Sequence, residues 1–146
     1  MRSAFLALVA GLLMLHPVRA AAQGIVPPVV TQGLTAYKLR GPEAALEAWM
    51  AGWPAETIPP AKERMLGTLK EIETVDGPMV GYDYLGTAEW GAHARRIYFT
   101  LLGNDRPAYL RLDVYQSDGT WRVLNVTIHT DPAQVFTTEM LSPGAH

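Results

Sequence analysis

The sequence predicts an α+β domain in which N-terminal helices pack on one face of a curved four-stranded antiparallel meander. Apolar residues recur at helical spacing up to Pro78, and from there to Asp131 they alternate with a period of two. No internal repeat or low-complexity tract divides the chain. With 146 residues and 49% hydrophobic side chains, it has the length of one domain and is too apolar to be disordered.

The first 22 residues are typical of a secretory signal peptide. Arg2 gives a positive start, residues 4–15 form an unbroken apolar run, and residues 20–22 are all alanine. We place cleavage after Ala22, with Ala20 as the alternative. As a helix the apolar run would span about 18 Å, too little for a hydrocarbon core of about 30 Å. We therefore expect a periplasmic or secreted protein with no membrane span after cleavage.

The charge and the cysteine count exclude several classes of function. Cleavage would leave 10 basic and 14 acidic side chains, a net charge of 10 − 14 = −4. This balance gives no electrostatic case for a nucleic acid or an anionic membrane as partner. The sequence has no cysteine, which excludes disulfides, thiolate metal sites and cysteine nucleophiles.

Three helices are predicted in the first half of the mature chain. Residues 23–30 should be extended, because Pro27 and Pro28 remove two amide donors. A helix over 31–40 is followed by a second one from Pro42. Its apolar stripe has the spacing i, i+3, i+4 and i+7 and comprises Leu46, Trp49, Met50 and Trp53. A third helix begins at Pro59-Pro60 and ends at Asp76-Gly77-Pro78.

Four strands follow, over 79–89, 94–102, 108–116 and 120–130. Residues 131–136 can form one capped helical turn, which ends a single domain over 31–136, and 137–146 form a tail. A four-residue loop at 103–106 predicts that Phe99 lies opposite Leu110 and Arg96 opposite Asp113.

The alternation of apolar residues in the last two strands selects the length of the loop between them. A two-residue loop at Asp118-Gly119 would place Asp113 opposite Leu124, whereas a three-residue loop at 117–119 places Leu112 opposite Leu124 and Leu110 opposite Val126. The three-residue loop is therefore predicted.

Three stretches of the chain resemble the nuclear-transport-factor-2-like and cystatin-like superfamily. They are Gly-Pro-Glu-Ala-Ala-Leu at 41–46, Tyr-Leu-Arg-Leu-Asp-Val-Tyr at 109–115 and Trp-Arg-Val-Leu at 121–124. The resemblance spans about residues 31–136. It implies a curved sheet whose concave side, under the helices, can hold a pocket and whose convex side often dimerises. The superfamily contains isomerases, dehydratases and pure binding modules, so it does not choose a function.

Few residues are suited to catalysis. After the signal the serines are Ser117, in a predicted turn, and Ser142, in the tail, so a serine nucleophile beside a histidine is close to excluded. His93, His129 and His146 show no metal-ligand spacing, and no glycine loop is arranged for a nucleotide. We therefore expect neither a metal nor a cofactor.

Two sets of residues are candidates for binding. The sheet face away from the helices combines aromatic and polar side chains, as interfaces do. A merely solvated face would have the same composition. The side chains of this face that are candidates for binding are Tyr98, Tyr109, Arg111 and Asn125. Candidates for lining a pocket, or for an ordinary core, are Trp49, Trp53 and Tyr82.

These sets predict a non-catalytic exported domain that binds a small molecule or a protein, or forms a homodimer through its sheet. The alternative is an isomerase- or dehydratase-like enzyme with an ionisable side chain in the concave pocket.

Overall fold

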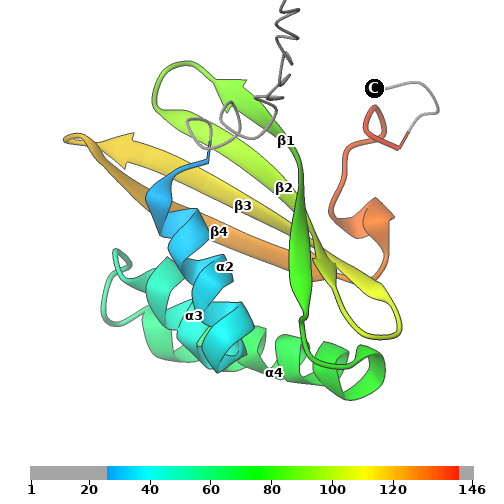
Figure 1. Cartoon of the computed structure of the whole chain (residues 1–146). Helices are drawn as coiled ribbons and strands as arrows, with labels where there is room; N and C mark the ends of the chain where they lie inside the picture. Colours follow the sequence, from blue (N-terminus) through cyan, green and yellow to red (C-terminus); the bar gives the residue numbers. More distant parts are fainter. Residues whose placement is uncertain (1–25, 142–146) are drawn as a thin grey trace, which may run out of the picture.

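The computed structural model describes residues 26–141, so the predicted signal peptide lies outside the described residues. Helices precede strands within this range: α2 (Pro28–Arg40), α3 (Pro42–Met50), α4 (Ile58–Asp76), β1 (Gly81–Trp90), β2 (Ala94–Leu102), β3 (Pro107–Ser117), β4 (Thr120–His129) and the short 3-10 helix η1 (Pro132–Gln134). The strands form one antiparallel sheet in the order β1-β2-β3-β4, and the three α-helices gather on one side of it (Figure 1). The predicted fold class is confirmed.

The helix boundaries follow from proline and glycine. The prediction of extended chain over 23–30 is wrong from Pro28 onward, because Pro28 stands at the first helical position, where a missing N–H costs nothing. Gly41, with φ of 88°, ends α2 and donates its N–H to the carbonyl of Tyr37. Helix α3 ends at Met50, so Trp53, the last residue of the predicted stripe, lies just beyond the helix.

The register of the β2–β3 hairpin is as predicted. Phe99 pairs with Leu110, Ile97 with Leu112, and Arg96 with Asp113. This pairing gives the sheet one continuously apolar face, which meets the helices.

The predicted register of the β3–β4 hairpin is wrong. Leu112 pairs with Val126 rather than with Leu124, and the loop has two residues rather than three. Asp118 and Gly119 both have positive φ, 51° and 75°, as a tight hairpin turn with the twist of the strands requires. A β-bulge between the pairs of Asp113 and Val114 then leaves Leu124 as an extra residue and restores the parity that a two-residue loop would have broken.

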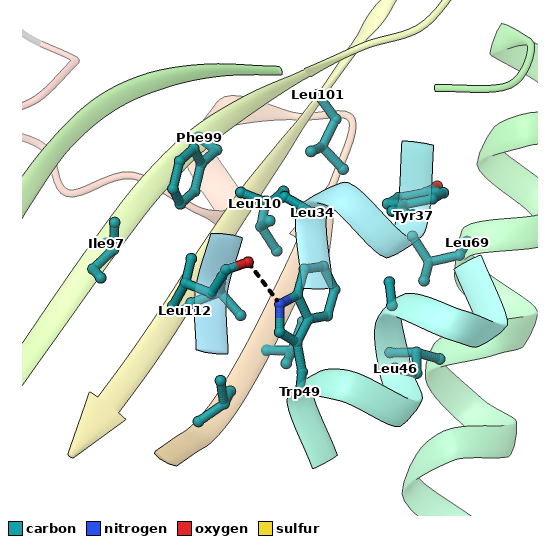
Figure 2. Close-up of a cluster of buried hydrophobic side chains, with 14 of the residues drawn as sticks. Leu34, Tyr37, Leu46, Trp49, Leu69, Ile97, Phe99, Leu101, Leu110 and Leu112 are labelled. Carbon is teal, nitrogen blue, oxygen red and sulfur yellow. Dashed lines mark hydrogen bonds between the residues drawn. The ribbon is translucent and has the colours of Figure 1, made fainter. Parts of the chain in front are cut away.

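The core is centred on Trp49, whose side chain is buried between the helices and the sheet (Figure 2). Its indole N–H donates to the carbonyl of Val30 over 3.3 Å, which ties α3 to the first turn of α2. Gly33 of α2 lies directly under the indole ring, so that a methyl group there would overlap the ring atoms. Helix α2 therefore approaches α3 closely because position 33 has no side chain.

Replacing Gly33 by alanine tests this packing. The substitution adds about 1 kcal/mol of helix propensity, yet we expect a net loss of about 1–3 kcal/mol in the free energy of unfolding because the ring must move. Urea denaturation of the mature chain measures it.

Gly67→Ala is the matched control, since Gly67 lies inside α4 with open space around it. There the same change should raise stability by up to about 1 kcal/mol. A Gly33→Ala protein as stable as the Gly67→Ala protein would contradict the packing argument.

Candidate functional site

The outer face of the sheet, which points away from the helices, carries the candidate site. Strand pairing places side chains on this face in transverse rows. One row consists of Tyr98, Arg111 and Thr127, and the next of Arg96, Asp113 and Asn125. Tyr109 lies two residues before Arg111 on the same strand, so all four residues predicted for a binding face lie on this face.

The C-terminal segment covers one end of the outer face. Asp131 caps η1 by accepting a hydrogen bond from the N–H of Ala133, and the chain then lays Phe136 against Tyr98 and Tyr109. The ring centroids are 5.9 and 5.0 Å apart, in edge-to-face geometry. Tyr98 is consequently only 2% exposed. Tyr98 and Tyr109 are therefore engaged with the chain's own C-terminal segment.

An ion pair organises the uncovered part of the outer face. Arg96 donates two hydrogen bonds to the carboxylate of Asp113, from Nε over 2.6 Å and from Nη2 over 3.2 Å. Hydrogen bonding to Asp113 raises the pKa of the Arg96 guanidinium, which therefore remains a cation. Asn125 donates to the same carboxylate over 3.4 Å and to the hydroxyl of Thr127 over 3.3 Å. These side chains form a hydrogen-bonded network whose members hold one another in place.

Arg111 extends this network. Its Nη2 donates to the hydroxyl of Thr127 over 3.2 Å. Its Nε atom is buried and has no hydrogen-bond partner among residues 26–141. Because Arg111 lies between Tyr98 and Thr127 in its row, much of its side chain packs against neighbouring residues of the sheet.

Two exposed aromatic side chains border the network. Trp90, Ala94 and Tyr115 form the next transverse row, in which Trp90 is 53% and Tyr115 43% exposed. The guanidinium of Arg96 lies 4.7 Å from the centre of the Trp90 ring, a cation–π contact that orients the indole. We call Trp90, Arg96, Asp113 and Tyr115 the aromatic patch.

Trp90 and Tyr115 are not among the residues predicted from the sequence for a binding face, although the sequence carries a signal for Trp90. A three-residue loop at Gly91-Ala92-His93 would have paired Trp90 with Ala94, as observed, and so placed it in line with Tyr115. The signal was incomplete because β1 has a bulge after Tyr84, so its first half does not show the parity of its second half.

The space enclosed between the helices and the sheet is nearly filled, and the larger hollows lie at its margin along β4. Trp49 is buried in the core, and Tyr82 packs edge-on against Phe99. The hollow between α2, α4 and the sheet measures about 10 Å³, which is no more than one water molecule needs. Trp53 donates its indole N–H to the carbonyl of Val123 over 2.6 Å and, with Trp49, lines an open cleft of about 430 Å³ beside the start of β4. The three predicted pocket residues therefore do not share one enclosed pocket.

Tyr37 and Glu73 form a titratable pair at the small hollow. Burial, and secondarily the carboxylate of Glu73, raise the pKa of the Tyr37 phenol well above its usual range. The phenol keeps its proton at neutral pH, which suits a structural hydrogen bond. Next to this pair, buried Asp76 accepts a hydrogen bond of 2.6 Å from Nε of Arg106.

Residues 26–141 contain no group of three histidine or acidic side chains placed to hold a metal ion. In the same range, no helix combines the length and the hydropathy that a membrane crossing needs.

Comparisons with protein-family models, with curated proteins and with solved structures found no match to this chain. The superfamily resemblance therefore stays a prediction.

Replacing Asp113 by asparagine tests the network, because it keeps the shape of the side chain and removes the charge that holds Arg96. Both side chains are mostly buried, so we expect the free energy of unfolding to fall by about 1–2 kcal/mol in urea denaturation. The control is Glu43→Gln, which removes an exposed ion pair with Lys62 and should cost less than about 0.5 kcal/mol. Equal losses in the two variants would contradict a structural role for the network.

Stability should fall in alkaline solution because of Tyr37. Above pH about 10 the unfolded chain loses the phenol proton while the folded protein retains it. Ionisation therefore stabilises the unfolded state relative to the folded state. Urea denaturation at about pH 8 and at about pH 10.5 should show this loss, and Tyr37→Phe should reduce it. Tyr115→Phe, at an exposed tyrosine, should leave the loss unchanged; an unchanged loss in Tyr37→Phe would show that other groups cause it.

Proposed function

We propose that this chain is an exported, non-catalytic binding module that holds a protein partner on the outer face of its sheet. The observation that supports this proposal is the aromatic patch, where two half-exposed aromatic side chains border a polar network that is held together by hydrogen bonds. Tryptophan, tyrosine and arginine are the side chains enriched at energetically dominant interface positions. A network that is ordered beforehand also reduces the conformational entropy lost on binding.

The filled helix side favours this proposal over an enclosed catalytic pocket. An isomerase-like site needs an ionisable side chain that faces a cavity large enough for a substrate. Here the hollow under the helices is about 10 Å³, and the pKa of Tyr37 beside it is shifted away from neutrality. A small-molecule carrier would need the same cavity, so a protein is the partner that suits the outer face best.

Photo-crosslinking in the cell of origin tests the proposal. A benzophenone amino acid at position 90 of the full chain should give one discrete adduct after irradiation, and its mass identifies the partner. Combining it with Tyr115→Ala should lower the yield about fivefold or more, because it removes the second aromatic contact.

Position 39 provides the matched control. Leu39 is a large apolar side chain that is 74% exposed on α2, and the helices lie on the other side of the sheet from the outer face (Figure 1). The same probe at position 39 should not give this adduct. Identical adducts from both positions, or none from position 90, would contradict a binding role for the outer face.

A further inference from the structure

Strand β4 leaves one edge of the sheet open. In the part of the chain that the structure describes, β4 pairs with β3 alone among the strands. The carbonyl of Val123 on its other side accepts the indole N–H of Trp53, so the unpaired backbone N–H and carbonyl groups of this edge lie beyond Val123, toward His129. The strand is ten residues long, contains no proline and has Arg122 as its one permanent charge. Soluble proteins usually protect such an edge with charges, prolines or a covering segment.

A groove runs along this edge between β4 and α4. It consists of two adjoining hollows of about 220 and 210 Å³, which share Thr68 and Ile128 in their walls. The apolar part of its α4 wall includes Met65, Ile72 and Val75, and Val75 is 57% exposed. An open strand edge beside an apolar groove can accept another chain in extended conformation.

The flank of α4 that borders the groove carries opposite charges in a symmetric arrangement. Arg64, Thr68, Glu71 and Val75 follow one another at spacings of four, three and four residues, so they lie on one stripe of the helix. Arg64 and Glu71 have no ion-pair partner among residues 26–141. The midpoint between them falls at Gly67 and Thr68, which are both exposed.

From this arrangement we infer that a second copy of the chain covers the edge. The two β4 strands pair antiparallel about a two-fold axis perpendicular to the sheet, which joins the two four-stranded sheets into one of eight strands. The same axis, passing near Thr68, sets the two α4 stripes antiparallel. Each Arg64 then faces Glu71 of the partner subunit, so the ion pair occurs twice in the dimer and every one of these charges is paired once. The charge pattern thus selects a second copy over an unrelated extended peptide.

The dimer goes beyond the proposed function and has a consequence for it. Because the axis is perpendicular to the joined sheet, both aromatic patches face the same side. A partner with two matching sites would bind both patches at once, with an effective concentration that raises its affinity.

Charge reversal at the two-fold axis tests the inference. Sedimentation velocity of the mature chain at about 0.1 mM should show a dimer. Arg64→Glu places two acidic residues face to face, and Glu71→Arg two basic ones, so each variant should dissociate at least about tenfold more readily. An equimolar mixture of the two variants should form a heterodimer, because every contact across the axis is then complementary again. Both positions are exposed, so the variants should fold, and circular dichroism verifies this.

Lys70→Glu is the control, since it changes the charge by the same amount as Arg64→Glu from the far side of α4. It should dimerise like the wild type. A monomeric wild type, undiminished dimerisation of the single variants, or no recovery in the mixture would each overturn the inference. Crosslinking from position 90 reports on the outer face, so a failure of the dimer and a failure of the proposed function are distinguishable.

Discussion

The contact between Gly33 and the indole ring of Trp49 is the constraint on which the rest of the structure depends. It lets α2 and α3 pack as one layer against the apolar face of the sheet, with Leu34 and Leu46 in the same buried cluster (Figure 2). Since the same side chains fill the space under the helices, little room remains there for a ligand. Under the binding role proposed above, recognition then falls to the outer surface of the sheet.

The two faces of the sheet are stabilised by different interactions. The helix side gains stability from apolar burial, whereas the outer face combines an ion pair, amide and hydroxyl hydrogen bonds and a cation–π contact. A network of this kind contributes modestly to stability but fixes the orientation of its members. Its cost in desolvation is limited because the side chains of Arg96 and Asp113 keep 25% and 18% of their surface exposed.

The sequence was sufficient for the fold class, the order of the elements and the β2–β3 register, because apolar periodicity and a polar loop specify them locally. It was insufficient where two local effects compensate. The Asp118-Gly119 turn and the bulge at Leu124 each change the parity of the last hairpin, and only their sum is visible in the apolar pattern. For the site, parity placed Tyr98, Tyr109, Arg111 and Asn125 on one face. That Phe136 covers two of them is a long-range contact with no periodic signal.

The two bulges also determine how the length of this chain can change in evolution. Leu124 in β4 and Leu85 in β1 are extra residues that oppose no partner, and both are exposed. Loss of either codon would leave every remaining side chain of its strand on its present face, because the pairs on both sides of the bulge would join directly. Loss of a neighbouring codon would keep the side chains on their present faces only if the bulge residue then took the place of the lost residue in the strand. Homologous chains one residue shorter in either edge strand could therefore keep the same core and the same outer face.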